Sequence, residues 1–199
     1  MPDPSPTPRL SARTAFGATT ARLDSLGPWT LTERPDRALA SVAARAADPQ
    51  QVADRLASRV GGAIALGQLA QGEDHDIFGT AQNQWFVMAD RTQQEDLARQ
   101  LKTELGDMAS VTEQNDGWVV FNLSGPGVCR VLERLVMADL AQMPDGSAQR
   151  MLLEHMNVVL LCRQHDQSYD ILVARSFALS LHHAVTTAMR SAAALATPS

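Results

Sequence analysis

The stretch from Gly117 to Gly127 reads GWVVFNLSGPG, and it brings two kinds of local structure together. Its first part is an apolar run, which is typical of a β-strand. The run ends in Ser124-Gly125-Pro126-Gly127, and the helical pattern VCRVLERLV follows. Glycine-rich turns between a strand and a helix often bind phosphate at the helix N-terminus. The turn is therefore either a phosphate site or only a connection.

Two features argue against a phosphate site. The dinucleotide-binding pattern G-x-G-x-x-G would need a third glycine at position 130, which is Arg130. Pro126 also lacks the backbone N–H that would face a phosphate. A capping turn explains the same residues: Ser124 caps the helix, Pro126 fits its first turn, and Gly127 allows close packing. We therefore expect a capping turn, in which Ser124→Ala would cost about 1 kcal/mol of stability.

The elements around this turn alternate irregularly between strands and helices. Residues 109–114 and 117–124 read as strands that Asn115-Asp116-Gly117 joins in a hairpin-type turn. The predicted elements that follow are a helix over 127–137 with Val128, Val131, Leu132 and Leu135 facing inward, strands over 149–156, 158–164 and 169–175 with a turn at 165–168, and a closing helix over 177–195 with Ser176 as its cap.

The first half of the chain has a similar order of elements. Two short strands flank a turn at 34–36, and a helix over 48–62 has Asp48 as its cap and a buried stripe every four residues. The remaining elements are strands over 63–70 and 83–90 around a loop at 71–82, then a helix with a capping box of Thr92 and Glu95, the stripe Leu97, Leu101 and Leu105, and a stop at Gly106. The pattern predicts an α+β fold of two similar halves, about 29–106 and 107–194.

Composition excludes several classes of protein. The net charge of −5 and the lack of a basic run disfavour nucleic-acid binding. No apolar run approaches the roughly 18 residues of a membrane span. The proline-rich start lacks a secretory signal, so we expect residues 1–28 to be a poorly ordered arm before one domain over 29–194. In a cytoplasmic protein, Cys129 and Cys162 are expected to be reduced and buried.

Histidine and acidic side chains do not form a recognisable metal site. His182 and His183 are neighbours on a helix, so they point about 100° apart and cannot share one ion. His75 lies in the acidic tip formed with Glu73, Asp74 and Asp76, which is typical of a solvated loop. His155 and Glu154 are adjacent in a predicted strand and point to opposite faces. We expect no metal-binding residues.

Nucleophilic and acid–base groups also have simpler structural explanations. Ser147 lacks the G-x-S-x-G elbow, and Cys129 lies on the apolar side of a helix. The aspartates that remain are better explained as turn or cap residues: Asp116, Asp139, Asp145 and Asp170. Trp29, Trp85 and Trp118 are either core residues or interface anchors. The residues alone predict a domain without catalytic, cofactor-binding or metal-binding residues of its own.

A family resemblance covers about residues 30–191. Residues 110–155 resemble the gamma subunit of heterotetrameric sarcosine oxidase, whose members carry a similar S-V-T-x-Q-x-D-G-W stretch followed by L-S-G-P. The tail RSFALSLHHAVTTAMRS, residues 175–191, is similar to the closing R-S-x-x-x-S-L-H-H-A helix of that family. NQW at 83–85 is a third, weaker landmark.

This resemblance implies a fold and a function. The fold would be like the folate-binding domain of an aminomethyltransferase, with two interleaved α/β halves and mixed or antiparallel sheets. The assembled enzyme demethylates sarcosine to glycine, produces hydrogen peroxide and passes the one-carbon unit to tetrahydrofolate. Its FAD, FMN, NAD and tetrahydrofolate belong to the partner subunits alpha, beta and delta. The gamma chain carries no cofactor.

Three alternatives remain open at this stage. The first is that the chain is the small subunit of a related N-methyl amino acid oxidase or dehydrogenase, because the small subunit does not hold the substrate. A second alternative is a stand-alone folate-binding transferase, although the chain is only about half as long as an aminomethyltransferase. A third is a folate-fold accessory protein for iron–sulfur assembly, but the Lys-Gly-Cys-Tyr-x-Gly-Gln-Glu string of that family does not occur here.

Overall fold

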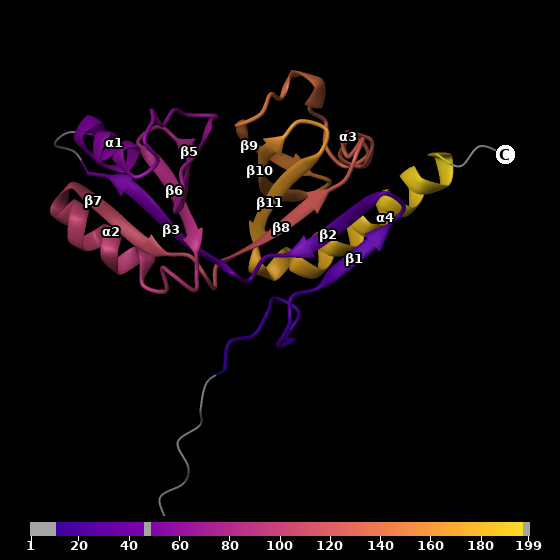
Figure 1. The fold of residues 1–199 in the computed structure, drawn as a ribbon, viewed down its shortest axis with the longest axis horizontal. Coiled ribbons are helices and arrows are strands. Elements are labelled where there is room, and N and C mark those ends of the chain that lie inside the picture. Colours follow the sequence, from indigo (N-terminus) through magenta and orange to yellow (C-terminus); the bar gives the residue numbers. More distant parts are fainter. Residues whose placement is uncertain (1–10, 46–48, 197–199) are drawn as a thin grey trace, which may run out of the picture.

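A computed structural model describes residues 11–45 and 49–196, in which two antiparallel sheets pack together with helices outside (Figure 1). The six-stranded sheet has the order β1 (Leu23–Leu26), β2 (Trp29–Glu33), β8 (Trp118–Ser124), β11 (Ser168–Ala174), β10 (Met156–Gln164) and β9 (Ala148–Leu153). The five-stranded sheet has the order β4 (Leu69–Gln71), β5 (His75–Ala81), β6 (Gln84–Asp90), β3 (Arg37–Ala44) and β7 (Ala109–Glu113).

Helices cover the outer face of each sheet, so the molecule has a helix–sheet–sheet–helix arrangement (Figure 1). The helices α1 (Pro49–Ser58) and α2 (Leu97–Leu105) pack on the five-stranded sheet. The helices α3 (Cys129–Leu132) and α4 (Ala178–Ala196) pack on the six-stranded sheet. Short 3₁₀ helices are η1 (Gly106–Met108), η2 (Leu140–Gln142) and η3 (Arg175–Phe177).

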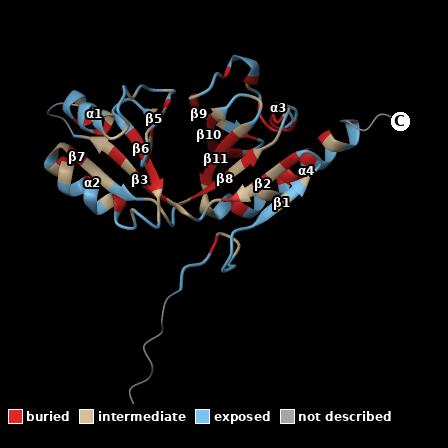
Figure 2. Ribbon diagram, in the orientation of Figure 1, coloured by how far each residue is buried: buried red, intermediate tan, exposed pale blue. Residues whose placement is uncertain are grey.

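Central strands are apolar at consecutive positions because both of their faces are buried. Successive side chains of a strand point to opposite faces. In β10, Leu160 joins the core under α3 and α4, whereas its neighbours Val159 and Leu161 join the core between the sheets. In β6, Trp85 faces the core of α1 and α2, whereas Phe86 faces the other sheet. Figure 2 shows the resulting concentration of buried residues on these strands and the exposed outer faces of the helices.

The chain crosses between the sheets twice, so the two halves are interleaved. The strand β2 pairs with β8, and β3 then continues in the five-stranded sheet. The strand β7 pairs with β3, and β8 returns to the six-stranded sheet. The expected boundaries 29–106 and 107–194 are therefore wrong, because β1 and β2 belong with the second half and β7 with the first. The α+β fold with two interleaved halves is confirmed.

The predicted hairpin at Asn115-Asp116-Gly117 is wrong for the same reason. The strands β7 and β8 belong to different sheets, and the turn between them makes the second crossing. The Asn115 side chain accepts a hydrogen bond from the backbone N–H of Leu39 at 2.7 Å, and so ties the crossing to β3. A local turn signal therefore gave the right position of a turn and the wrong partner strand.

The expected arm over 1–28 is wrong for residues 11–28, whereas residues 1–10 lie outside the described part. The strand β1 pairs with β2, with Leu23 opposite Thr32. The buried Glu33 carboxylate accepts the backbone N–H groups of Ala15 at 2.7 Å and Arg22 at 3.3 Å. These hydrogen bonds hold a segment that its composition predicted to be loose.

Several element boundaries also differ from expectation. The expected loop at 71–82 contains β5, whose Ile77 and Phe78 are fully buried. The capping box is wrong, because α2 begins at Leu97 and the Thr92 hydroxyl donates to Asp90 Oδ1 at 2.6 Å. The stripe Leu97, Leu101 and Leu105 is buried as predicted. The helix expected over 127–137 has only four α-helical residues, although its four inward positions are buried.

Candidate functional site

The backbone N–H groups of the Ser-Gly-Pro-Gly turn donate hydrogen bonds to other residues of the protein. From Gly125 to Cys129, each residue with an N–H donates to the turn between β10 and β11. The acceptors are Gln167 O for Gly125 at 2.8 Å, Asp166 O for Gly127 at 3.0 Å and for Val128 at 3.4 Å, and Asp166 Oδ1 for Cys129 at 3.0 Å. A phosphate would have to compete with these bonds, so the turn is a connection between a strand and a helix.

Asp166, rather than Ser124, satisfies the start of α3. The N-cap position of this helix is Val128, so Ser124 does not cap it. Asp166 reaches the helix from a loop about 40 residues further along the chain, with a φ of 54° that aspartate tolerates better than most residues. The sequence shows Asp166 only as a turn residue, because nothing local connects it with Cys129.

Gly125 is required by close backbone contact. Its φ is 133°, and a Cβ atom would lie 2.3 Å from the carbonyl oxygen of Pro28. The indole of the buried Trp29 donates to the Pro126 carbonyl at 3.0 Å. The turn thus packs directly onto the start of β2, and its glycine serves this packing rather than a ligand.

The two cysteines are free, buried thiols in apolar surroundings. Cys129 Sγ lies 3.3 Å from the Tyr169 hydroxyl, which is 3.4 Å from His165 Nδ1. Burial raises the pKa of the Cys129 and Cys162 thiols and of the Tyr169 phenol. A thiol must ionise to act as a nucleophile, so this cluster stabilises packing and does not favour covalent catalysis.

The histidines weighed as metal ligands have other partners or face solvent. His182 Nε2 lies 2.7 Å from Asp24 Oδ2, whereas His183 is exposed. His155 is exposed in the tight turn between β9 and β10, where Glu154 has a φ of 51°. Within 11–45 and 49–196, no group of three His, Cys, Asp or Glu side chains could hold a metal ion.

His75 is buried rather than part of a solvated acidic tip. Its Nε2 atom lies 2.9 Å from Arg59 Nη1, and Arg59 also binds Glu104 at 2.5 Å. Because a guanidinium can only donate, Nε2 must accept, and only a neutral ring can do so. Burial and the charge of Arg59 lower the pKa of His75. The neutral ring therefore contributes to the packing of β5 rather than to metal binding.

Asp76 and Asp170 form an ion cluster with Arg163 across the two sheets. Arg163 of β10 lies 2.7 Å from Asp76 of β5 and 2.7 Å from Asp170 of β11. The Asn122 amide donates to Asp170 Oδ1 at 2.8 Å. The Asp170 contact is a hydrogen bond through Nε, whereas Nη2 is close to the carboxylate without suitable geometry for a hydrogen bond. The cluster connects the two sheets through Arg163.

The serine and the three further aspartates that the sequence analysis weighed lie in separate turns. Ser147 is buried, and its hydroxyl donates to the Pro144 carbonyl at 2.6 Å. Asp139 caps η2 by accepting the Ala141 N–H, and Asp145 accepts the N–H of His165. Asp116 is exposed in the second crossing. The structure brings none of these together as an acid–base pair among the residues that it describes.

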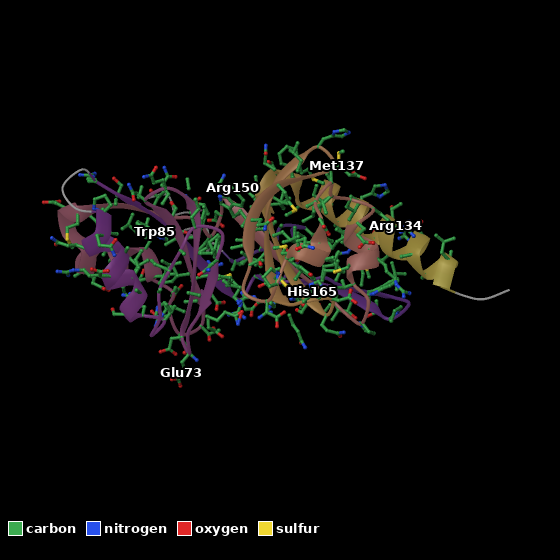
Figure 3. The ribbon with its side chains drawn as sticks, turned by 90° about the horizontal axis from the view of Figure 1, so that it is seen from above. Glu73, Trp85, Arg134, Met137, Arg150 and His165 are labelled. Carbon is green, nitrogen blue, oxygen red and sulfur yellow. The ribbon has the colours of Figure 1, made fainter. Side chains whose placement is uncertain are left out.

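Trp29 and Trp85 are core residues, with 1% and 7% of their surface exposed. Trp118 is partly exposed, and its ring lies edge-on to Phe86 at 5.4 Å. Figure 3 shows Trp85 in the half of the five-stranded sheet, away from Arg134 and Met137 at the other end.

An apolar groove of about 450 Å³ borders the edge strand β9. Its exposed apolar side chains are Met137, which is fully exposed, and Leu152, which is about half exposed. The charged Glu133, Arg134 and Glu154 also line it. Exposed apolar patches with a polar rim are typical of contact surfaces.

A feature that the sequence did not reveal is a small pocket lined by arginines, where the crossing segments meet. Arg13, Arg34, Arg37, Arg91 and Arg175 line it together with one acid, Glu33. These arginines come from four segments of the chain, so no local motif indicates them. None of the helices in the described part of the chain is long and apolar enough to cross a membrane.

Comparisons with solved structures identify the fold. A chain of heterotetrameric sarcosine oxidase from Corynebacterium sp. U-96, solved in complex with pyrrole 2-carboxylate, matches 89% of this chain and 90% of its own length, with a TM-score of 0.75 and 21% sequence identity. This protein has the fold of that sarcosine oxidase chain. The resemblance seen in the sequence is thereby confirmed at the level of the fold.

A more distant match agrees with this fold. Aminomethyltransferase T of the glycine cleavage system from Bartonella henselae has a TM-score of 0.60 and 12% identity over 81% of this chain. The match covers 47% of the length of the aminomethyltransferase chain, so the present fold corresponds to about half of that enzyme. No protein-family model and no curated protein matches the sequence.

Proposed function

We propose that this chain is the gamma subunit of a heterotetrameric sarcosine oxidase, and that it contributes contact surface rather than catalytic residues. The observation that carries the proposal is the fold shared over about nine-tenths of both chains. The local sequence match over 110–155 and 175–191 supports the same assignment.

The chemistry of this chain's own side chains supports a non-catalytic role. The buried thiols favour their protonated form, the neutral His75 ring is hydrogen-bonded to Arg59, and Asp170 is paired with Arg163. The backbone donors of the glycine-rich turn are used within the fold. The reactive groups thus serve packing, and the proposal assigns no catalytic, cofactor-binding or metal-binding residue to this chain.

In this proposal the oxidative demethylation of sarcosine takes place in the partner chains. FAD, FMN, NAD and tetrahydrofolate would bind to the alpha, beta and delta subunits, and the assembly would act in the cytoplasm. The apolar groove beside β9 is suited to contact with another chain, because burying Met137 and Leu152 removes apolar surface from water. The negative net charge is consistent with protein partners rather than nucleic acid.

Reconstitution tests this assignment. The alpha, beta and delta chains of a sarcosine oxidase are co-expressed with and without this chain, and the complex is purified through a tag on the alpha chain. We expect this chain to co-purify in equal stoichiometry and to raise the yield of complex that produces hydrogen peroxide from sarcosine. Stoichiometric flavin on the isolated chain, or the absence of any association, would contradict the proposal. Other N-methyl amino acids in the same assay distinguish a related oxidase.

A second candidate is a folate-binding protein of the aminomethyltransferase type, which the TM-score of 0.60 to such an enzyme favours. This candidate predicts that the isolated chain binds tetrahydrofolate. Calorimetric titration of the full chain with tetrahydrofolate separates the candidates, because a non-catalytic small subunit would give no saturable heat.

A further inference from the structure

The arginine pocket is built on backbone that other elements hold in place. It lies where the chain crosses between the sheets. The crossing segments are near the lower centre of Figure 1. The backbone N–H of Arg34 donates to Val120 O at 2.8 Å, that of Arg91 to Asp36 O at 2.7 Å, and that of Arg175 to Gly117 O at 3.0 Å. Hydrogen bonds therefore hold the backbone of three of the five arginines in place.

Positive charge exceeds negative charge in the wall. Arg34 is paired with Asp36 at 2.7 Å, and Arg37 lies 3.9 Å from the same carboxylate. Arg175 donates to the carbonyl oxygens of Arg13 and Thr14, both at 2.9 Å, rather than to an acid. In the residues that the structure describes, the side chains of Arg13 and Arg91 have no carboxylate within 4 Å.

Acidic groups near the pocket are already engaged. The oxygens of Glu33 accept the backbone N–H groups of Ala15 and Arg22. Asp90, which precedes Arg91, accepts the hydroxyl and the backbone N–H of Thr92. These hydrogen bonds leave the carboxylates charged, but the five guanidinium groups of the wall outnumber the carboxylates of Glu33, Asp36 and Asp90.

The size of the pocket suits a small anion. Its cavity of about 30 Å³ has room for roughly two water-sized groups, which matches the two oxygens of a carboxylate. Guanidinium groups bind planar carboxylates through paired hydrogen bonds. Leu39, Trp118 and Val119 provide apolar wall for the carbon that carries the carboxylate.

We propose that this pocket is a binding site for a carboxylate group, with Arg91 as a principal ligand. The group is either a free small carboxylic acid or an acidic side chain of a partner protein, and both present the same planar anion. Its lining residues are not those of the Arg163 ion cluster or of the apolar groove. The proposal concerns the isolated full chain and does not depend on the identity of any partner complex.

Titration with acetate tests the site. Binding of sodium acetate to the full chain is measured by the shift of the unfolding midpoint and by broadening of the acetate NMR signal, with sodium chloride replacing acetate at constant ionic strength. We expect saturable binding that Arg91→Gln weakens about tenfold or more, the loss of a charge-assisted hydrogen bond. Arg150→Gln, which removes an exposed arginine of β9, is the matched control and should bind as the unchanged protein does.

Two further measurements complete the test. An unchanged unfolding midpoint of Arg91→Gln in chloride establishes that this variant is folded, and Arg13→Gln provides a second variant in the same wall. N-acetyl-aspartate amide distinguishes the source: its binding indicates a partner's side chain, whereas binding of acetate alone indicates a free acid. Acetate binding that is absent, or that Arg91→Gln and Arg150→Gln weaken equally, would overturn the proposal.

Discussion

Gly125 lies so close to the backbone of Pro28 and Trp29 that an added side chain has no room. Gly125→Ala should destabilise the protein by at least about 3 kcal/mol, because a methyl group would force apart β2 and the turn after β8. Urea unfolding followed by tryptophan fluorescence measures this loss. Gly127→Ala is the control, since its Cβ would meet nothing nearer than the Arg130 side chain at 3.7 Å, and it should cost less. Equal losses would contradict the account.

Removing the Asp166 side chain should lower the stability of α3 more than removing the Ser124 side chain, although the sequence predicted Ser124 as the helix cap. Asp166→Ala removes the acceptor for Cys129 N–H and leaves alanine at a φ of 54°, so we expect a loss of about 2 kcal/mol. Asp166→Asn keeps an acceptor and tolerates this φ, and Ser124→Ala changes no cap, so each should cost less than about 0.5 kcal/mol. Chemical unfolding of the three variants decides; a larger loss from Ser124→Ala would restore the original prediction.

His75 makes stability depend on pH in a predictable direction. Burial and Arg59 lower its pKa in the folded protein, so the unfolded chain binds more protons below its ordinary pKa of about 6.5. The contribution of His75 is complete above about pH 6.5 and is lost as pH falls toward the lower folded pKa. Unfolding free energies between pH 7.5 and 5 should show a decline that His75→Gln reduces. His183→Gln, at an exposed position, should leave the decline unchanged; the reverse pattern would refute the assignment.

At the scale of elements, hydrophobic periodicity predicted where strands and helices lie better than it predicted their ends and partners. The stripe Leu97, Leu101 and Leu105 fixed α2 because a buried helix face must repeat every three or four residues. The strand β5 escaped notice because its buried His75 and its short apolar pair Ile77-Phe78 follow an acidic tip. The pairing of strands was predicted wrongly for another reason. Whether β7 pairs with β8 or with β3 depends on contacts across the whole sheet.

The candidate sites also divide into those that adjacent residues reveal and those that only the fold assembles. The argument against a phosphate site could be made from the sequence, because Pro126 and the missing glycine are local facts. Asp166 as a cap, the Arg163 cluster and the arginine pocket each join residues far apart in the chain. No local pattern encodes such sites, since they arise only when the two crossings bring distant segments together.

The whole molecule should unfold as one unit, which tests our proposal that the chain folds as a single domain that includes β1. The two sheets share a core in which Phe78 is fully buried and stacks on Phe86 at 5.6 Å. Phe78→Ala should therefore cost about 3–5 kcal/mol and keep one transition, seen alike by far-UV circular dichroism and by tryptophan fluorescence. Phe177→Ala, at a residue 45% exposed, should cost less than about 1 kcal/mol. Separate transitions for the two probes would show that the sheets unfold independently.

The central claim is that this chain acts as an assembly subunit. Its most direct test is the mass of the complex formed with the alpha, beta and delta chains of a sarcosine oxidase, measured by size-exclusion chromatography with light scattering. Met137→Glu and Leu152→Glu place charge in the apolar groove, whereas Leu66→Glu changes an equally exposed leucine elsewhere. The account predicts one copy of this chain in a stable complex that produces hydrogen peroxide from sarcosine, and weaker association only for the two groove variants. A complex that forms with full activity in the absence of this chain, and that does not take it up when it is added, would contradict the account.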